Sequence, residues 1–299
     1  MMQVAILGAG TMGHGIAQVS AMGGHDVRLR DLETEIVEAG LDAIESNLDG
    51  GVERDKLTPS EAESARSRII GTTSLPEAVT GADLVVEAVP EELPIKHDTV
   101  TDVEEHVDPD CLIASNTSSL SLTQIANALN RPERAIGLHF FNPVHIMDLV
   151  EVVVAEQTTE ETIDTATDFV EGIQKTPVTV ADSPGFASSR LGVALGVEAM
   201  RMVGEGVADP RDIDTAMELG YNHPMGPIEL GDVVGLDVRL DILEYLREEL
   251  GERFRPPQVL KRKVRAGKLG KKTGEGFYVW DDGEVVGVSG SGGGRDGAQ

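Results

Sequence analysis

The sequence predicts an α/β N-terminal domain followed by an all-helical C-terminal domain. Two patterns lead to this prediction. In the first part of the chain, short apolar runs alternate with stretches of helical character, which is typical of a parallel sheet covered by helices. Beyond Asp182-Ser183-Pro184-Gly185, a turn-forming sequence, the chain has helical character throughout. We therefore expect one domain over residues 1–182 and a second over residues 183–286.

The N-terminal domain begins with a strand, a glycine-rich turn, a helix and a second strand. Residues 4–7 form a short apolar run that ends at the turn, which indicates a buried strand. A helix is predicted over Thr11–Met22 and a second strand over Asp26–Arg30, where alternate residues are apolar. This order of elements is the βαβ unit from which parallel sheets are built.

The elements that follow continue the pattern. A charged stretch over residues 33–68 predicts a helical hairpin that is broken near Gly50-Gly51. Two further strands are predicted over residues 84–86 and 111–114, with a helix over residues 94–106 between them.

Two later strands form a pair of a different kind. Apolar runs over Ala135–Phe140 and Leu149–Val154 each have the length of a strand. The loop between them is too short for a crossover helix, so the two strands are expected to run antiparallel.

The C-terminal domain is expected to consist of helices, over residues 187–205, 210–219, 238–250 and 257–266. The final segment, residues 287–299, is rich in glycine and serine and has no core-forming residue after Val288. We expect this segment to be disordered.

The charge of the chain excludes several kinds of partner. The 299 residues include 25 Lys and Arg against 52 Asp and Glu, a net charge of −27. Such a field repels nucleic acids and anionic membranes. No apolar run reaches the ~18 residues that a membrane span requires. The acidic surplus favours adaptation to high salt, where ions screen the repulsion, over an ordinary acidic composition.

The N-terminus and the cysteine content bear on the location of the protein. The first residues lack the basic start and the cleavage site of a signal peptide. The single cysteine, Cys111, cannot form a disulfide within the chain. Both features fit a reducing cytoplasm.

The turn after the first strand has the sequence Gly8-Ala9-Gly10-Thr11-Met12-Gly13, a GxGxxG pattern. Gly8 permits a tight turn, Gly10 lets the backbone approach a pyrophosphate, and Gly13 lets the helix pack against the strand. The N-terminus of the helix then faces the anion. The pattern alone is weak evidence, but its position between a strand and a helix indicates a Rossmann-like, dinucleotide-binding domain.

A carboxylate after the second strand indicates which dinucleotide is bound. Asp31 stands 23 positions after Gly8. A carboxylate there accepts hydrogen bonds from the ribose hydroxyls and repels the extra phosphate of NADP, so NAD is the expected cofactor. Arg28 and Arg30 are close in sequence and keep NADP open as an alternative.

A histidine and a glutamate form a candidate acid–base pair. His139 lies near the end of one strand of the antiparallel pair, and Glu151 lies inside the other among leucine and valine residues. A carboxylate in an apolar strand is costly unless it is paired. If the two residues meet, the carboxylate fixes the tautomer of the imidazole and favours its protonated form. The spacing leaves a second interpretation equally open, in which Glu151 faces solvent and His139 is a core residue.

A rival base is His145. It follows His139 closely, and its nearest carboxylate in the sequence is Asp148. We rank it below His139 because it lies on a loop and not at the end of a strand.

With these residues assembled, the chain resembles the short-chain 3-hydroxyacyl-CoA dehydrogenase family from Val4 to Trp280. Six motifs carry the resemblance: Ser115-Asn116-Thr117-Ser118-Ser119-Leu120, His139-Phe140-Phe141-Asn142-Pro143, Leu149-Val150-Glu151-Val152-Val153, Asp182-Ser183-Pro184-Gly185-Phe186, His223-Pro224-Met225-Gly226-Pro227 and Gly270-Lys271-Lys272-Thr273-Gly274-Glu275-Gly276-Phe277-Tyr278. One such match can arise by chance, but six in the order of the family do not.

The resemblance implies NAD-dependent oxidation of (S)-3-hydroxyacyl-CoA to 3-oxoacyl-CoA by hydride transfer, with no metal ligands. It implies that His139 is the catalytic base and Glu151 its orienting partner. Ser118 and Asn142 match catalytic-site residues of the family that contact substrate and nicotinamide. On a purely structural interpretation, Ser118 caps the following helix and Asn142-Pro143 is a turn.

Other family positions match residues that hold the cofactor or the substrate. The cofactor contacts implied are Gly8, Gly10, Thr11, Met12, Gly13, Asp31, Glu91, Lys96, Ser118, Asn142 and Lys272. The substrate contacts implied are Ser118, Arg54 and Ser189. For Lys96 and Lys272 an alternative stays open, in which each is a solvated surface charge.

Two departures from the family pattern concern recognition of the acyl-CoA substrate. Ser189 stands where the family has an asparagine that contacts the substrate. The helical hairpin of the family carries lysines that hold CoA phosphates, whereas residues 33–63 of this chain offer only Arg54 and Lys56.

The resemblance also implies a cytoplasmic homodimer with a role in fatty acid metabolism. Two other functions stay open. One is a dehydrogenase of a free 3-hydroxy acid. The other is a non-catalytic NAD-binding or structural protein, because a fold does not fix a function.

Overall fold

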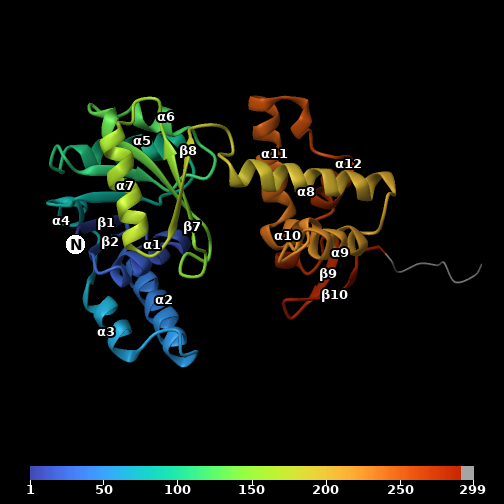
Figure 1. Ribbon diagram of the computed structural model, residues 1–299, viewed down its shortest axis with the longest axis horizontal. Coiled ribbons are helices and arrows are strands. Elements are labelled where there is room, and N and C mark those ends of the chain that lie inside the picture. The colour runs from blue at the N-terminus through green and yellow to red at the C-terminus, as the bar shows by residue number, and fades with distance from the viewer. Residues whose placement is uncertain (291–299) are drawn as a thin grey trace, which may run out of the picture. The chain divides into compact units, whose positions relative to one another are not determined.

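The computed structural model of the chain describes residues 1–290 (Figure 1). The chain divides into two compact units, of which the first is Met1–Phe186 and the second begins at Ala187. The division falls after Phe186 rather than after Asp182, because the Phe186 side chain is buried in the core of the first unit. Within residues 1–290, none of the helices combines the length and the apolar character needed to cross a membrane.

The first unit is built around an eight-stranded sheet with the strand order β3-β2-β1-β4-β5-β6-β7-β8. Strands β1 to β6 run parallel, β7 runs antiparallel to β6, and β8 runs parallel to β7. The order reverses between β1 and β4, which is the arrangement of a doubly wound, Rossmann-like sheet. This confirms the fold class predicted for the N-terminal part. The strands are β1 (Gln3–Leu7), β2 (Asp26–Arg30), β3 (Ile69–Thr72), β4 (Leu84–Glu87), β5 (Leu112–Ser115), β6 (Ala135–Phe140), β7 (Leu149–Val154) and β8 (Thr176–Ala181).

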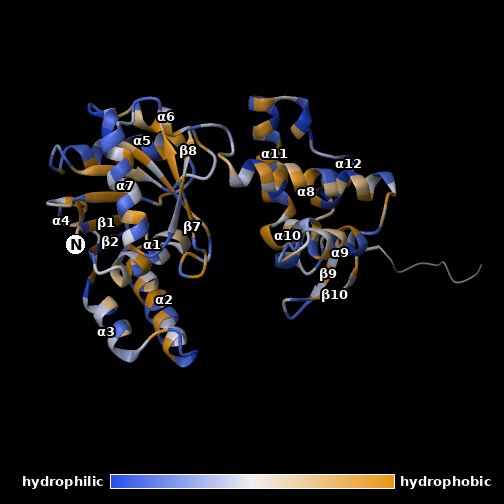
Figure 2. Cartoon of the chain, viewed as in Figure 1, coloured by the Kyte–Doolittle hydropathy of each residue, from blue (hydrophilic) through white to orange (hydrophobic). Residues whose placement is uncertain are grey.

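The core of this unit lies along the strands. In β1, which is paired on both sides, the four residues from Val4 to Leu7 are fully buried. A parallel strand is covered on both faces, so its sequence is apolar throughout rather than alternating. Figure 2 shows the resulting concentration of hydrophobic residues along the large sheet. The helices of the unit are α1 (Thr11–Met22), α2 (Thr34–Glu53), α3 (Pro59–Ser67), α4 (Leu75–Val79), α5 (Leu93–Glu104), α6 (Leu122–Ala126) and α7 (Glu160–Gly172), with the 3-10 turn η1 (Pro132–Arg134).

The helical hairpin formed by α2 and α3 breaks later than predicted. Gly50 and Gly51 lie inside the last turns of α2, and a side chain at Gly51 would collide with Leu57. The chain reverses at Asp55, which has a positive φ of 55°. Helix α3 then begins at a capping box whose first residue is Thr58. Gly51 therefore allows the loop to pack closely on α2 and does not end the helix.

Several elements of the first unit escaped the sequence analysis, namely the strands β3 and β8, the helices α4, α6 and α7, and the turn η1. Helices α4 and α6 have five residues each, too few to show a helical period. Helix α7 begins with a polar turn, Glu160-Glu161-Thr162, which hides its apolar face in the sequence.

The second unit is helical, but it is not all-helical. Its helices are α8 (Ser188–Glu205), α9 (Pro210–Tyr221), α10 (Pro227–Val234), α11 (Leu236–Leu250) and α12 (Gln258–Arg265), with the 3-10 turns η2 (Glu252–Phe254) and η3 (Lys271–Thr273). A two-stranded antiparallel sheet follows, which the sequence analysis did not predict, and its strands are β9 (Tyr278–Asp281) and β10 (Glu284–Val288).

The predicted disorder of residues 287–299 is wrong at its start. Gly287 and Val288 belong to β10 and pair with Val279 and Tyr278 of β9. Their pairing depends on contacts that the glycine-rich sequence does not reveal. The part of the prediction that concerns residues 291–299 lies outside the described residues.

Two buried carboxylates attach this strand pair to the helices. Asp232 of α10 is fully buried and accepts hydrogen bonds from the backbone N–H groups of Phe277 and Tyr278 at 2.9 and 2.8 Å. The indole Nε1 of Trp280 donates to the same carboxylate at 3.1 Å. Asp214 of α9 accepts from the Tyr278 hydroxyl at 2.7 Å. Burial raises the pKa of both carboxyl groups, against the effect of these hydrogen bonds.

Candidate active site

Four adjacent parallel strands end at one edge of the large sheet. Strand β1 leads into the glycine loop, β4 ends at Glu87, β5 leads into the turn that carries Ser118, and β6 carries His139 next to its last residue. In doubly wound sheets, ligands bind at the carboxyl edge of the strands. The topology therefore brings residues from four separate stretches of sequence to one candidate site.

The glycine loop has the geometry that a bound pyrophosphate requires. Gly8 has a φ of +100°, and a Cβ there would lie 2.5 Å from the carbonyl oxygen of Ala88. A Cβ at Gly13 would lie 1.6 Å from the carbonyl oxygen of Gly8, whereas Gly10 faces open space. Helix α1, which begins at Thr11, has no side-chain cap and no acidic residue in its first turn. Its first N–H groups are therefore available to an anion, so the loop fits NAD.

Asp31 follows β2 and lies against this loop. Its Oδ2 accepts a hydrogen bond from the backbone N–H of Ala9 at 2.7 Å, and its Oδ1 accepts one from Leu32 at 2.7 Å. The neighbouring Arg30 donates from Nε to the carbonyl oxygen of Thr73 at 3.3 Å. The site therefore presents a carboxylate beside the loop, where it suits a ribose and opposes an extra phosphate.

His139 and Glu151 stand directly opposite each other in the antiparallel pair of β6 and β7. The predicted antiparallel pairing is thus confirmed. Nδ1 of His139 lies 2.8 Å from Oε2 of Glu151, and the two residues are 6% and 1% exposed. The interpretation in which Glu151 faces solvent is therefore wrong. An ionised carboxylate only accepts hydrogen bonds, so a neutral imidazole in this contact carries its proton on Nδ1 and has its lone pair on Nε2.

Two aromatic rings flank the imidazole. The ring centroid of Phe141 lies 4.5 Å from that of His139, and the centroid of Phe186 lies 5.6 Å away. These rings and the sheet restrict the imidazole to one orientation and limit its access to water.

The turn after β5 is held by a carboxylate. Oε1 of Glu91 accepts hydrogen bonds from the backbone N–H groups of Ser118 and Ser119 at 2.9 and 3.0 Å. The hydroxyl of Thr117 donates to the same oxygen at 2.6 Å. Burial opposes ionisation of Glu91, but the Lys96 ammonium and these hydrogen bonds together lower the pKa of Glu91 below its usual value. Ser118 is thereby fixed with its side chain exposed.

The structural alternative for Ser118 is wrong. Helix α6 is capped by Ser121, whose hydroxyl accepts from the backbone N–H of Gln124. Ser118 lies three positions earlier in the sequence and does not cap this helix.

Lys96 is a buried charge and not a solvated one. It is 1% exposed, and its Nζ lies 2.9 Å from both carboxylate oxygens of Glu87, which is also 1% exposed. Nζ also lies 3.3 Å from Oε2 of Glu91. Burial raises the pKa of Glu87, and the Lys96 ammonium opposes part of that rise. The sequence analysis missed Glu87, although a carboxylate that ends an apolar strand is the same signal that singled out Glu151.

The remaining candidate residues are distributed over both units. In the first unit, Asn142 is exposed after β6, and Arg54 is exposed at the end of α2. In the second unit, Ser189 lies in the first turn of α8. Lys272 lies in η3, where its Nζ is 2.6 Å from Oδ2 of Asp237 and its side chain is 45% exposed.

His145 has surroundings that differ from those of His139. Burial and the neighbouring basic groups of Lys175, Arg54 and His14 lower the pKa of His145. These neighbours oppose the positive charge that a general base must take up, whereas the partner of His139 is a carboxylate.

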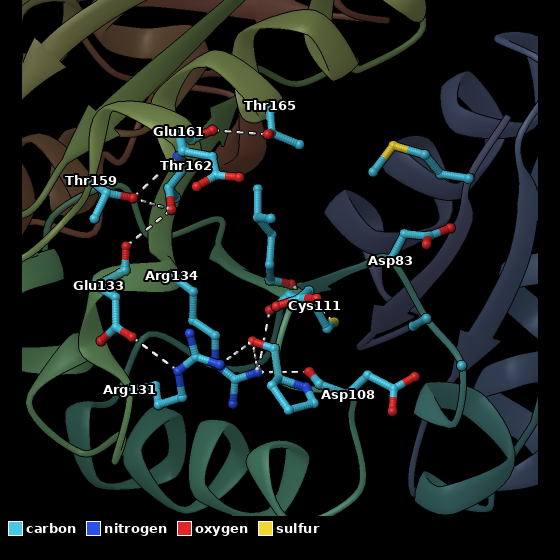
Figure 3. A pocket seen from close by; sticks show the side chains of 16 residues that line it. Asp83, Asp108, Cys111, Arg131, Glu133, Arg134, Thr159, Glu161, Thr162 and Thr165 are labelled. Carbon is cyan, nitrogen blue, oxygen red and sulfur yellow. Dashed lines mark hydrogen bonds and ion pairs between the residues drawn. The ribbon is translucent and has the colours of Figure 1, made fainter.

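A cavity of about 640 Å³ lies in another part of the first unit (Figure 3). Its lining includes Asp83, Cys111 and Arg134, which stand next to the starts of β4, β5 and β6. It contains none of the candidate residues named above. Within residues 1–290, no group of three or more His, Cys, Asp or Glu side chains is arranged to hold a metal ion.

Comparison with known proteins bears on the family. Residues 3–183 match the family described as 3-hydroxyacyl-CoA dehydrogenase, NAD binding domain, and residues 185–280 match the one described as 3-hydroxyacyl-CoA dehydrogenase, C-terminal domain. The chain is 45% identical over 280 residues to a probable 3-hydroxybutyryl-CoA dehydrogenase of Deinococcus radiodurans, with 93% of this chain and 100% of the relative covered. It is 41% identical over 281 residues to a 3-hydroxybutyryl-CoA dehydrogenase of Clostridioides difficile, with 94% and 100% covered.

Solved structures agree with this assignment. The crystal structure of (S)-3-hydroxybutyryl-CoA dehydrogenase from Ralstonia eutropha is 40% identical and superposes with a TM-score of 0.91, over 94% of this chain and 100% of that one. The structure of a diketoreductase is 30% identical with a TM-score of 0.79, over 94% and 99%. The resemblance carried by the six motifs is confirmed. The chain belongs to the 3-hydroxyacyl-CoA dehydrogenase family and is an NAD-dependent oxidoreductase.

Proposed function

We propose that this chain oxidises (S)-3-hydroxyacyl-CoA to 3-oxoacyl-CoA with NAD, and that His139 is the base that removes the hydroxyl proton. The observation that carries the proposal is the 2.8 Å contact between Nδ1 of His139 and the carboxylate of Glu151. This contact leaves the Nε2 lone pair of a neutral imidazole for a substrate hydroxyl. The names of the relatives, 3-hydroxybutyryl-CoA dehydrogenases, support a short acyl chain.

In the oxidation direction, Nε2 of His139 accepts the proton of the substrate hydroxyl while a hydride leaves C3 of the substrate. The negative charge of Glu151 then stabilises the imidazolium, in a site where both residues are buried. Bound NAD supplies the hydride acceptor, C4 of its nicotinamide ring. In the reverse direction the imidazolium returns the proton to the oxygen of the 3-oxo group.

Ser118 and Asn142 complete the proposed reacting centre. Both side chains are exposed, and both lie next to the carboxyl ends of neighbouring strands, β5 and β6. A hydroxyl and an amide can each donate and accept hydrogen bonds, as contact with a substrate oxygen and with the nicotinamide carboxamide requires.

For the cofactor, we propose contacts from the glycine loop, Asp31, Glu91 and Lys272. Lys96 is enclosed by carboxylates, so its action on the cofactor would run through Glu91, whose side chain is 36% exposed. The position of Asp31 against the loop supports NAD rather than NADP.

For the acyl-CoA substrate, we propose that Arg54 contacts a phosphate and Ser189 the thioester carbonyl. Arg54 and Lys56 are exposed between α2 and α3, where they supply two cations on an acidic chain. They are the only basic residues between residues 33 and 63, which favours a second candidate function. In this second function the substrate is a free 3-hydroxy acid, and a structural relative named for dicarbonyl compounds supports it.

We also propose that the enzyme is a cytoplasmic homodimer in fatty acid metabolism, adapted to high salt. Large apolar side chains are exposed on the second unit, among them Leu191 at 71%, Leu219 at 83% and Tyr221 at 75%. Exposed apolar surface of this kind is typical of an interaction site. The 52 acidic residues against 25 basic ones support the adaptation to salt.

The test is the rate of NADH oxidation with acetoacetyl-CoA, measured beside acetoacetate in molar potassium chloride. The proposal expects a kcat/KM for acetoacetyl-CoA far above that for acetoacetate. A preference for acetoacetate would support the second candidate. NADH binding without turnover of either compound would show that the fold serves a non-catalytic function.

A further inference from the structure

A buried ion pair at the candidate site does not itself contact the substrate or the reacting atoms in the chemistry proposed above. Glu87 at the end of β4 and Lys96 in α5 are each 1% exposed, and Nζ lies 2.9 Å from both carboxylate oxygens. Burying two charges carries a large desolvation cost, so a buried pair is weak evidence for stability by itself. In some proteins such a pair selects one conformation among several. The contacts of this pair show which conformation it would select.

A first series of contacts runs from Lys96 to the turn that carries Ser118. Nζ of Lys96 lies 3.3 Å from Oε2 of Glu91. The other oxygen of Glu91 faces the turn and accepts the backbone N–H groups of Ser118 and Ser119. Lys96 thus bridges two carboxylates and orients Glu91 so that its second oxygen meets the turn.

A second series runs from Glu87 to the same turn. The hydroxyl of Ser115 donates to Oε1 of Glu87, and Ser115 is itself 1% exposed. The Ser115 oxygen then accepts the backbone N–H of Thr117 at 3.2 Å. The backbone carbonyl of Glu87 accepts the N–H of Asn116 at 2.9 Å. Both ends of the turn are therefore tied to the ion pair.

The turn is also tied to the strand that carries His139. Oδ1 of Asn116 accepts the backbone N–H of Phe140 at 2.9 Å, one residue beyond His139. Ser118 and His139 both lie at the carboxyl edge of the large sheet. The position of the turn therefore determines where the Ser118 side chain lies relative to His139.

We infer that Glu87 and Lys96 are positioning residues, whose ion pair fixes the turn at residues 115–119 and thereby the Ser118 hydroxyl relative to His139. The inference rests on the proposed function, in which Ser118 contacts the substrate. Neither charged group touches the reacting atoms, so the effect is indirect. Reacting groups that are misplaced by about 1 Å can lose ~100-fold in rate, so a small movement of the turn is enough.

The test begins with Glu87→Gln, which keeps the size of the side chain but leaves Lys96 with Glu91 as its charged partner. We expect kcat/KM for acetoacetyl-CoA to fall by about 10- to 100-fold at a temperature where the variant is folded. We also expect faster amide hydrogen exchange in the peptide that contains residues 115–119. The turn would lose the Glu87 carboxylate at Ser115, and Glu91 would no longer be oriented by an intact ion pair. A merely structural role would lower the melting temperature and leave these two quantities unchanged.

A matched control is available at another buried ion pair of the same unit. Glu104 and Arg134 have side chains that are 9% and 7% exposed and lie 2.9 Å apart. Their hydrogen bonds reach the segments at residues 108–111 and 130–131 and not the turn. Glu104→Gln should lower the melting temperature while kcat/KM and exchange at residues 115–119 keep their wild-type values.

The inference is overturned if Glu87→Gln behaves as Glu104→Gln does, with a lower melting temperature and no other change. If Glu87→Gln does not fold, Ser115→Ala replaces it, because that substitution removes only the hydroxyl of the second series. A several-fold loss of kcat/KM with faster exchange would support the inference, and wild-type values of both would refute it. If the wild-type enzyme does not turn over acetoacetyl-CoA, the proposed function fails. The exchange measurement then decides whether the pair holds the turn.

Discussion

Nδ1 of His139 lies 2.8 Å from Oε2 of Glu151 because the antiparallel pairing of β6 and β7 places the two residues opposite each other. The contact does not depend on a flexible loop. Val150 and Val152, which flank Glu151 in the strand, are fully buried, so the carboxylate cannot turn to solvent without disrupting the sheet. The imidazole is therefore held in its orientation by the sheet itself.

His139→Ala should remove the base and keep the cofactor site. General acid–base catalysis contributes ~10²–10⁴-fold, and kcat for reduction of acetoacetyl-CoA should fall by that factor. NADH binding, followed by fluorescence titration, should be retained because the glycine loop is untouched. His145→Ala is the control and should keep the wild-type kcat. A near-normal kcat of His139→Ala would remove this residue from the mechanism.

Glu151→Gln keeps the size of the side chain and removes the charge that stabilises the imidazolium. A hydrogen bond to a charged group contributes ~1.5–3 kcal/mol, so kcat should fall by about 10- to 100-fold. Its pH profile should move to lower pH, because protonation of the imidazole loses its favourable partner. The exposed Glu171→Gln serves as the control. An unchanged pH profile of kcat would show that the carboxylate does not act on the imidazole.

Asp31 should make the enzyme prefer NADH over NADPH. Repulsion between like charges near a protein surface amounts to ~1–4 kcal/mol. Asp31→Asn should therefore lower the ratio of kcat/KM for NADH to kcat/KM for NADPH by about tenfold or more. The amide oxygen can still accept the N–H of Ala9, so the loop should keep its shape. A wild-type preference for NADPH would show that Arg28 or Arg30 binds the extra phosphate.

Ser189 should be replaceable if it contacts the thioester carbonyl as proposed. A serine hydroxyl is shorter than the asparagine amide of the family and can reach the carbonyl through a water molecule. We expect Ser189→Ala to reduce kcat/KM for acetoacetyl-CoA less than tenfold, by about 1 kcal/mol, and Ser189→Asn to be active or improved. Damage by Ser189→Ala as severe as that by His139→Ala would indicate a chemical role. An inactive Ser189→Asn would show that the pocket has a different shape.

Salt should stabilise this chain. With 52 acidic against 25 basic side chains, the net charge of −27 repels itself when ions are dilute, and the Debye length shrinks from ~10 Å at 0.1 M to ~3 Å at 1 M. The melting temperature and kcat/KM should both rise between dilute buffer and molar potassium chloride. Potassium sulfate and sodium chloride at equal ionic strength separate screening from ion-specific effects. An equal melting temperature at low and high salt would show that the acidic composition is not an adaptation to high salt.

The parts of the fold that could be predicted from the sequence are those in which burial requires a run of apolar residues. Strands β6 and β7 have the bounds predicted for them, Ala135–Phe140 and Leu149–Val154, because both strands are buried and apolar at most of their positions. The pair of β9 and β10 was missed for a different reason. Its strands are short and adjoin the glycine-rich end of the chain, and they are held by hydrogen bonds to Asp232, which is distant in sequence.

The candidate site divides in the same way. Glu151 could be singled out because a carboxylate inside an apolar strand needs a partner. Glu87 shows the same signal, but its partner Lys96 lies on a helix, where a lysine is normally solvated. The hydrogen bond between Asn116 and Phe140 forms because β5 and β6 are neighbours in the sheet. The order of strands in a sheet cannot be predicted from a local stretch of sequence.

Asp232 also restricts the order in which a newly synthesised chain can fold. Its donors at Phe277, Tyr278 and Trp280 lie 45, 46 and 48 residues further along the chain. Domains fold from the N-terminus during synthesis, so α10 emerges with a carboxylate that cannot yet be buried without cost. The first unit has all of its strands by Ala181 and can fold well before that moment. The carboxylate of Asp232 in a nascent chain therefore lacks these donors until Trp280 has been made, long after the strands of the first unit are complete.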